Sequence, residues 1–261
     1  MSSLESGSSA LNHSTSSWPR AASRGTQHST LQLNRLGLLG GSFNPIHNGH
    51  LTIASLVREQ LQLDRVLFIP TGDPPHKRNG SLAPASARLE MVRLAIAGSP
   101  YFEISDIEVK RTGKSYSIDT VRELQNRYSP STELFFIIGL DAFLDFPDWK
   151  EPRALLNACR FVVVPRPGHS FRSLVRLSLL PSLDPRALDN LDAGSLARLD
   201  IPIPSGPGII CLPIPPCLIS SSAIRQEIRG GATLANLLPP PVESYILRHS
   251  LYQEDRYRTH I

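Results

Sequence analysis

Two histidines that are three residues apart, His47 and His50, follow a pair of glycines at the end of a short apolar run. Gly40 and Gly41 permit a tight turn in which backbone N–H groups approach an anion closely. Asn48 is predicted to cap the helix that follows, so that the positive end of this helix faces the same anion. Because residues three apart share one helix face, both imidazoles can donate N–H groups to phosphate oxygens in a transition state.

The same segment lacks the GxxxxGK[ST] pattern, so it is a phosphate-binding turn but not a Walker loop. Gly49 removes a side chain where a phosphate would approach. A metal site is the alternative, because two histidines in HxxH spacing can supply two ligands. No third carboxylate or cysteine stands nearby in the sequence, so no bound metal is predicted. Phosphate binding is favoured over a pair of ordinary surface histidines.

A second pattern for binding anions lies about 170 residues further along the chain. Ser220, Ser221 and Ser222 precede a predicted helix, where their hydroxyl and N–H groups can cap the helix or bind phosphate. Arg225 lies one turn into this helix and can reach an anion at its start. Taken alone, three serines before a helix are an ordinary cap. Together with the histidines, they predict two helix N-termini that converge on one triphosphate.

Alternating strands and helices must position these residues. Apolar runs predict strands over five segments, which are 36–39, 65–70, 102–109, 133–140 and 160–166. Apolar residues at helical spacing predict helices over 49–61, 85–97, 117–128 and 241–252. This order is typical of an α/β fold, a Rossmann-like doubly wound parallel sheet with helices on both faces and a C-terminal helical portion. Such sheets bind ligands at the carboxyl ends of their strands, so the site is expected in the loops after Leu39, Ile69, Ile138, Val164 and Leu218.

The chain is expected to consist of a leader and one domain. Residues 1–35 are rich in serine and have no helical or strand period, which predicts a disordered leader; an organelle transit peptide is the alternative. Residues 36–261 are expected to form the domain. Within it, residues 169–208 are interpreted as a variable insertion of short helices with an irregular, proline-bound end, and residues 209–214 are a further strand candidate.

Composition narrows the class of protein and its partners. The 261 residues carry a net charge of +4, and residues 1–35, with three arginines and one glutamate, account for +2 of it. A surplus this small predicts no nucleic-acid partner. Three cysteines without CxxC spacing argue against a disulfide framework and fit the reducing cytoplasm. The longest uncharged run, residues 201–224, contains six prolines, so no membrane-spanning helix is expected there.

These segments carry a resemblance that runs from about Leu36 to the C-terminus and is weakest over residues 169–208. The sequence GGSFNPIHNGHL is similar to the GxFxPxHxGH motif of the adenylyltransferase and cytidylyltransferase superfamily, and ISSSAIR resembles its ISSTxIR motif, with Ser222 in place of threonine. Three further segments, PTGDPPHK, DIEVKRTGKSYSIDT and IIGLD followed by Trp149, resemble blocks of the bacterial nicotinate-nucleotide adenylyltransferases. The resemblance implies that residues 36–261 form a nucleotidyltransferase domain.

The resemblance also implies site residues. The catalytic residues are His47, His50, Lys77 and Arg225. The ATP-binding residues are Gly40, Gly41, Ser42, Phe43, Gly49, Gly139, Asp141, Arg166, Ile219, Ser220, Ser221 and Ser222. The residues that bind the second substrate are Asn44, Tyr116, Thr120, Trp149 and Lys150. Trp149 is implied to stack on a pyridine ring, while backbone N–H groups near Thr120 and Lys150 hold its carboxylate. A salt bridge at the strand ends is the alternative for Asp141 and Arg166, and an exposed turn is the alternative for Tyr116.

The implied reaction joins ATP to nicotinate mononucleotide and gives deamido-NAD and pyrophosphate. Because the attacking phosphate is already an anion near neutral pH, aligning two polyanions and stabilising charge suffices, without a general base or a covalent intermediate. Mg²⁺ is expected as a cofactor that the ATP phosphates carry. Nicotinamide mononucleotide or phosphopantetheine as the substrate, and a non-catalytic nucleotide-binding module, are the alternatives. No membrane partner is expected, and a homo-oligomer is left open.

Overall fold

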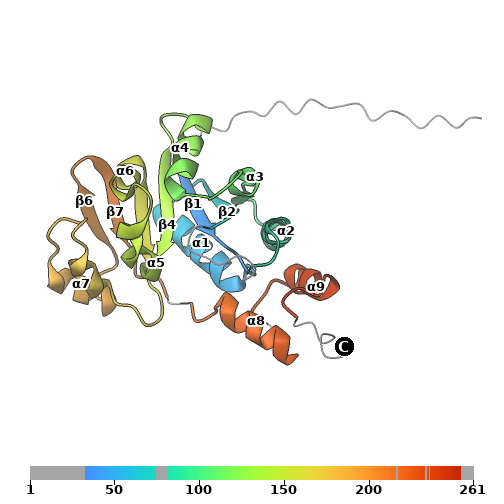
Figure 1. Ribbon diagram of the computed structural model, residues 1–261. Helices are drawn as coiled ribbons and strands as arrows, with labels where there is room; N and C mark the ends of the chain where they lie inside the picture. Colours follow the sequence, from blue (N-terminus) through green and yellow to red (C-terminus); the bar gives the residue numbers. More distant parts are fainter. Residues whose placement is uncertain (1–32, 75–81, 216, 233, 235, 254–261) are drawn as a thin grey trace, which may run out of the picture. The chain divides into compact units, whose positions relative to one another are not determined.

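The computed structural model describes residues 33–74, 82–215, 217–232, 234 and 236–253, so nearly all of the predicted leader lies outside the described residues. In the described part of the chain, seven strands form one sheet in the order β3-β2-β1-β4-β5-β7-β6 (Figure 1). The strands are β1 (Arg35–Gly41), β2 (Arg65–Pro70), β3 (Phe102–Ile104), β4 (Glu133–Gly139), β5 (Arg160–Val164), β6 (Leu199–Ile203) and β7 (Gly206–Cys211).

The strand order reverses between β1 and β4. From β1 the chain moves outward through β2 to β3, and it then returns to pair β4 on the other side of β1. Both neighbours of β1 run parallel to it, with Leu39 opposite Phe68 of β2 and Ile137 of β4. Among the seven described strands, the edge strand β6 is the one that pairs in an antiparallel direction, with its neighbour β7. A reversal of this kind leaves a crevice beyond the carboxyl ends of the two central strands.

Helices cover both faces of the sheet (Figure 1). One face packs against α1 (Asn48–Leu61), α2 (Ala85–Ile96), α8 (Ser221–Gly230) and α9 (Pro240–Arg248). The other packs against α3 (Ile107–Lys110), α4 (Ser117–Arg127), α5 (Leu140–Leu144), α6 (Pro152–Ala158) and α7 (Pro185–Asp192), with the 3-10 helices η1 (Phe146–Asp148) and η2 (Phe171–Arg176). The predicted α/β class and the C-terminal helical portion are confirmed.

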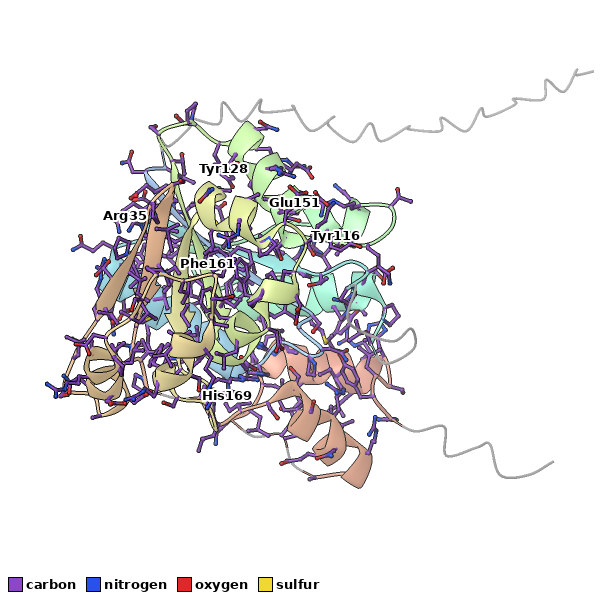
Figure 2. All side chains as sticks on the ribbon, turned by 60° about the vertical axis from the view of Figure 1, so that its left-hand side comes forward. Arg35, Tyr116, Tyr128, Glu151, Phe161 and His169 are labelled. Atoms are coloured by element: carbon purple, nitrogen blue, oxygen red, sulfur yellow. The ribbon has the colours of Figure 1, made fainter. Side chains whose placement is uncertain are left out.

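Strand alternation divides the core between these two faces. In β5, Phe161 and Val163 join the core under α4 to α7, whereas Val162 and Val164 join the core under α1, α2, α8 and α9. Figure 2 shows Phe161 in the interior, between the sheet and the helices that cover it. Because both faces are buried, the central strands contain only apolar residues and glycine after a charged first residue, which explains why the sequence shows them as nearly continuous apolar runs.

The strand predicted over 102–109 is wrong in its second half. The strand ends at Ile104, and residues 107–110 form the short helix α3. Ile107 packs into one core while Glu108 is buried towards the loop after β2. A short strand followed by one helical turn can bury the same apolar residues as one longer strand. The apolar pattern over eight residues therefore could not distinguish these two structures.

The region 169–208 contains the predicted short helices, which are η2 and α7. The prediction that this region ends in irregular structure is wrong. Residues Leu199–Ile203 form β6, which pairs with β7, and β7 starts three residues before the predicted segment 209–214. Pro202 is exposed in this edge strand, near a shift in the pairing register. Proline is tolerated in edge strands because its missing N–H group breaks no central ladder.

Within the described ranges, no helix is both long and apolar enough to cross a lipid bilayer.

Candidate active site

A cleft of about 590 Å³ opens at the carboxyl edge of the sheet, where β1 and β4 separate. The loops after β1, β2, β4 and β5 line it, together with the starts of α1, α4 and α8. Eighteen of the 21 predicted site residues line this one cleft: His47, His50, Arg225, Gly40, Gly41, Ser42, Phe43, Gly139, Asp141, Arg166, Ser220, Ser221, Ser222, Asn44, Tyr116, Thr120, Trp149 and Lys150. Gly49 and Ile219 do not line it, and Lys77 lies outside the described residues.

The two histidines begin α1 and stack on each other. Their ring centroids are 3.7 Å apart, and the backbone N–H of His47 donates to Nδ1 of His50 at 3.2 Å. The neutral His50 ring therefore carries its proton on Nε2, which is a hydrogen-bond donor. Nδ1 of His47 is buried and has no hydrogen-bond partner among the described residues. A buried polar atom of this kind is commonly paired with a ligand or a water molecule.

Both histidines are neutral in the free protein near pH 7. Burial, and secondarily the positive charge of Arg166, lower the pKa of His47 to about 4. Burial also lowers the pKa of His50 well below its usual value, and the charges of His47 and Arg166 act in the same direction. The pair therefore acts on an anion through N–H dipoles, while Arg166 supplies positive charge on the same side of the cleft.

The structure corrects the predicted cap of α1 and shows what surrounds Gly49. The N-cap of α1 is His47, and Asn48 is the first helical residue. The Asn48 side chain instead donates to the carbonyl of Asn236, which joins the start of α1 to the segment between α8 and α9. A Cβ atom at Gly49 would lie 2.1 Å from Sγ of Cys217 and 3.0 Å from Nδ1 of His47. The approach of Cys217 therefore requires glycine at position 49, and the contact of Gly49 with a phosphate stays a prediction.

The serine triplet begins α8 and is bonded directly to the loop after β1. Oγ of Ser220 caps the helix by accepting from the N–H of Ala223, and Oγ of Ser221 donates to the carbonyl of Pro45 at 2.9 Å. Nη1 of Arg225 donates to the carbonyl of Asn44 at 2.8 Å. The two helix N-termini, 170 residues apart in sequence, are therefore held at one cleft, as predicted.

Asp141 and Arg166 form an ion pair in the cleft wall, with the carboxylate and guanidinium 3.2 Å apart. They follow β4 and β5, which are adjacent and parallel. The alternative interpretation, a salt bridge at the strand ends, describes this geometry correctly. Both side chains nevertheless face the cleft, so they can exchange the ion pair for contacts to a ligand.

The start of α4 forms the far end of the cleft, with Tyr116, Ser117 and Thr120 in its wall. Trp149 also lines the cleft, and its ring packs edge-on against Phe136. Nζ of Lys150 lies 3.0 Å from the carboxylate of Asp119 and 4.7 Å from the centre of the Tyr116 ring. This end is therefore aromatic, with helix N–H groups at one side.

The backbone N–H of Thr120 already donates to the carbonyl of Tyr116. A helix leaves its first N–H groups without intrahelical partners, so Ser117 and Ile118, rather than Thr120, present donors here. The Thr120 hydroxyl donates to Oε1 of Glu108 at 2.8 Å and accepts from Arg111 at 2.7 Å. Thr120 thus shapes the site by fixing its neighbours.

Sequence reasoning missed Glu108 as a residue of the cleft wall. Its carboxyl group is buried, and burial raises its pKa, although the hydrogen bond from Thr120 and the charge of Arg111 oppose this rise. Glu108 belongs to the family-like segment DIEVKRTGKSYSIDT, but it was given no role there and fell within a predicted strand. The helix α3 turns it inward.

No group of three or more histidine, cysteine, aspartate or glutamate side chains in the described part of the chain could hold a metal ion. A resident metal centre therefore does not fit these residues.

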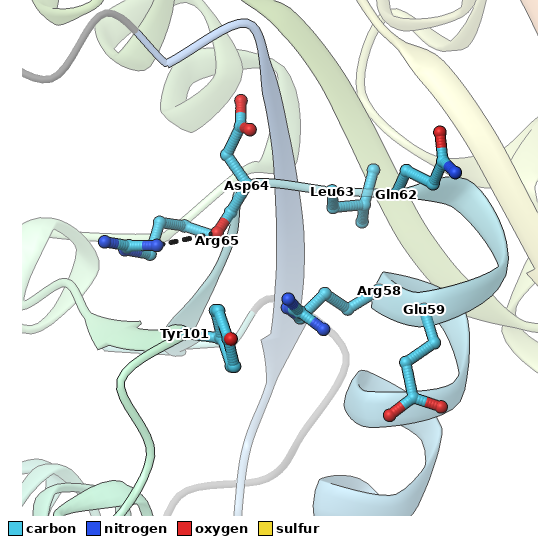
Figure 3. A pocket seen from close by; sticks show the side chains of 7 residues that line it. All are labelled: Arg58, Glu59, Gln62, Leu63, Asp64, Arg65 and Tyr101. Carbon is cyan, nitrogen blue, oxygen red and sulfur yellow. Dashed lines mark hydrogen bonds between the residues drawn. The ribbon is translucent and has the colours of Figure 1, made fainter.

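A second hollow of about 460 Å³ lies at the opposite edge of the sheet, where α1 ends and β2 begins. Figure 3 shows its lining residues, among which the guanidinium of Arg58 lies 3.4 Å from the centre of the Tyr101 ring. Arg65 donates to the carbonyl of Asp64 and pairs with Glu103. This hollow lies at the end of α1, and none of the described helices begins among its lining residues, whereas α1, α4 and α8 begin at the carboxyl edge. The cleft at the carboxyl edge is therefore the candidate active site.

A doubly wound sheet with two helix N-termini at its switch point defines a nucleotide-binding α/β protein.

The family model described as cytidylyltransferase-like matches residues 38–227. The probable nicotinate-nucleotide adenylyltransferase of Geobacter metallireducens is 46% identical over 222 residues, which cover 85% of this chain and all of that protein. A protein of the same description from Geotalea daltonii is 45% identical over 225 residues, with the same coverage.

Solved structures agree on the fold. Plasmodium falciparum nicotinic acid mononucleotide adenylyltransferase complexed with NaAD superposes with a TM-score of 0.62, at 18% identity, over 84% of this chain and 97% of that one. The chain belongs to the cytidylyltransferase-like family and, within it, to the nicotinate-nucleotide adenylyltransferases.

Proposed function

We propose that this chain transfers the adenylyl group of ATP to nicotinate mononucleotide, with release of pyrophosphate. The observation that carries the proposal is the convergence of the α1 and α8 N-termini on one cleft whose far end is aromatic. An oxygen of the mononucleotide phosphate attacks the α-phosphorus of ATP, and the bond from that phosphorus to the β-phosphate oxygen breaks. Every described member of the predicted site except Gly49 and Ile219 lines this cleft, which supports the proposed contacts to the two substrates.

The histidines are proposed to stabilise the charge that moves onto the phosphates. His50 donates from Nε2, because its Nδ1 is occupied by the N–H of His47. The rings are fixed by stacking, so they need no reorganisation when charge develops. Ser220 to Ser222 and Arg225 meet the phosphates from the start of α8. Lys77, which lies outside the described residues, is proposed as a further cation at the triphosphate.

The aromatic end is proposed to receive the pyridine ring, with Trp149 and Tyr116 as its walls and the first N–H groups of α4 facing its carboxylate. A carboxylate presents acceptors to such donors and suits the positive end of a helix, whereas an amide brings one acceptor and no charge. This arrangement supports nicotinate mononucleotide over its amide counterpart.

Mg²⁺ is proposed to arrive with ATP. It would neutralise charge on the leaving phosphates, with phosphate and water oxygens as its ligands. The described residues supply only scattered carboxylates at the cleft, namely Asp141 and Glu108, of which Asp141 is paired with Arg166.

The proposed partners are therefore ATP and nicotinate mononucleotide, with no nucleic-acid partner and an open oligomeric state. We propose the cytoplasm as the location, because all three cysteines are free thiols and both substrates are intracellular nucleotides. The leader outside the catalytic domain is proposed to be shorter than the predicted residues 1–35, because Arg35 is already the first residue of β1 and pairs with Glu133 of β4.

The test is pyrophosphate release from ATP with nicotinate mononucleotide, measured beside nicotinamide mononucleotide and phosphopantetheine. The acid should be adenylylated with the highest kcat/KM. A higher value for either other acceptor would reassign the substrate, and no release with any of them would favour a nucleotide-binding module.

His50→Ala tests the catalytic role of the histidines. Loss of one transition-state donor should lower kcat by about 10² to 10³, with a much smaller change in the Kd of ATP. Measuring turnover and ATP binding on the same preparation separates the two effects. Unchanged turnover would remove His50 from the mechanism.

A further inference from the structure

Arg88 is a buried cation that no part of the proposed reaction uses. It lies in the first turn of α2, only 1% exposed, on the face that also carries Met91 and Val92. Burial lowers the pKa of Arg88, which the charges of Glu108 and Tyr252 oppose, and an arginine remains protonated in either case. A buried charge is costly unless its donors are satisfied, so its hydrogen bonds show what holds it there.

The guanidinium donates to three backbone carbonyls from three separate segments. Nη1 donates to Ser42 at 2.8 Å, Nη2 to Gly72 at 3.1 Å, and Nε to Ala83 at 3.0 Å. Ser42 belongs to the loop after β1, Gly72 follows β2, and Ala83 precedes α2. The rigid fork of arginine can bond all three at once, which the single ammonium of a lysine cannot match in geometry.

The hydrogen bonds of Arg88 to Ser42 and Gly72 lie just beyond the end of the β1–β2 ladder. The ladder between β1 and β2 ends at Gly41 and Pro70, and one more backbone bond joins Thr71 to Gly41 at 2.9 Å. Ser42 and Gly72 lie one or two residues beyond that point, in the loops that follow the two strands. Arg88 donates to both carbonyls and so joins these two loops.

The two segments that Arg88 joins lead to the starts of α1 and α4, which pack on opposite faces of the sheet and both line the cleft. Ser42 is next to the turn that leads to the histidines. Gly72 packs under the backbone of Glu108, where a Cβ atom would lie 2.1 Å from the Glu108 carbonyl oxygen. Glu108 in turn holds the hydroxyl of Thr120 at the start of α4. The triphosphate end and the aromatic end are thus connected through one guanidinium.

We propose that Arg88 is a positioning residue that sets the distance and orientation between the two substrate-binding ends of the cleft. The inference rests on the proposed transfer between two bound phosphates, because only a reaction between two substrates requires such alignment. Each substrate can bind its own end without it. Misplacement by about 1 Å of groups that must react can cost on the order of 10²-fold in rate.

The experiment compares wild type with Arg88→Lys and Arg88→Met, and with Arg93→Lys as the matched control. Arg93 is in the same helix but exposed, and it pairs with Glu90 on the surface. Four quantities are measured: kcat from pyrophosphate release, the Kd of ATP, the Kd of nicotinate mononucleotide, and the melting temperature. Turnover is expressed per folded molecule, counted by the stoichiometry of ATP binding.

Arg88→Lys should lower kcat by about 10- to 100-fold while each Kd stays within about threefold of wild type. Arg88→Met should lower kcat further than Arg88→Lys does, and Arg93→Lys should have the kcat and Kd values of wild type. Unchanged kcat per folded molecule with a lower melting temperature would show a purely structural role and overturn the proposal. The proposal would also be overturned if substrate binding weakened in parallel with kcat, or if neither Arg88 variant folded. The wild-type rate in the same assay tests the proposed reaction itself, and if another acceptor is preferred, the same ratios are measured with that acceptor.

Discussion

Acidification from pH 7 to pH 4 should destabilise this protein through His47, and a His47→Gln variant should lose less stability over the same range. The imidazole is 3% exposed, and its pKa is lowered from 6.5 to about 4, first by burial and then by Arg166. As the pH falls below 6.5, the unfolded chain binds a proton at this residue and the folded chain does not. The unfolded state is therefore favoured increasingly until the pH reaches the folded pKa.

The magnitude follows from the difference between the two pKa values. A shift from 6.5 to about 4 corresponds to about 3 kcal/mol of unfolding free energy that is present at pH 7 and lost by pH 4. Carboxylates also titrate in this range, but they do so in both proteins. The comparison of wild type with His47→Gln therefore removes most of their contribution.

The assay is urea denaturation at half-unit steps between pH 7 and pH 4. His169→Gln serves as the matched control, because His169 is exposed at the edge of the molecule (Figure 2). The curves of wild type and His169→Gln should fall together, and that of His47→Gln should fall by about 3 kcal/mol less. Parallel curves for all three proteins would refute the burial of a neutral imidazole at position 47.

Three further predictions test the geometry around this residue. Arg166→Gln should raise the pKa of His47 in an NMR titration, since a nearby positive charge is removed; an unchanged value would leave burial as the sole cause. Gly49→Ala should lower the unfolding free energy by about 1–3 kcal/mol, because its Cβ meets Cys217 Sγ, and adding Cys217→Gly should recover most of it. An unchanged free energy of unfolding for Gly49→Ala in urea denaturation would contradict the close approach of Cys217 to Gly49. A thiol reagent should modify only the partly exposed Cys217 in the folded protein and all three cysteines in urea, and rapid reaction of more than one thiol before unfolding would contradict the burial of the other two.

The strands and helices that carry the site follow directly from the sequence. Buried parallel strands must be apolar on both faces, so β1, β2, β4 and β5 are visible as continuous runs. The positions of the loops then follow, since each ligand-binding loop comes directly after such a run. The histidine and serine segments could be placed in those loops because helix caps and tight turns are encoded by the residues within them.

Shorter or less regular elements could not be predicted in the same way. The helix α3 has four residues and β6 contains a proline, so neither spans enough residues to show a period. Both are fixed by partners distant in sequence, α3 by the core under the sheet and β6 by its pairing with β7. Tertiary packing overrides weak local preference in such segments.

The sequence by itself determined most of the residues that line the cleft, because strand ends and helix starts are local features. Only the tertiary structure decided which partner each side chain meets. The sequence does not show that Cys217 approaches Gly49, and this contact exists only because the segment before α8 packs against the start of α1. Likewise, Arg88 is one charged residue among several in α2, and its role depends on three carbonyls that converge only when β1, β2 and α2 have packed. Such contacts depend on distances between segments far apart in the chain, which no local pattern encodes.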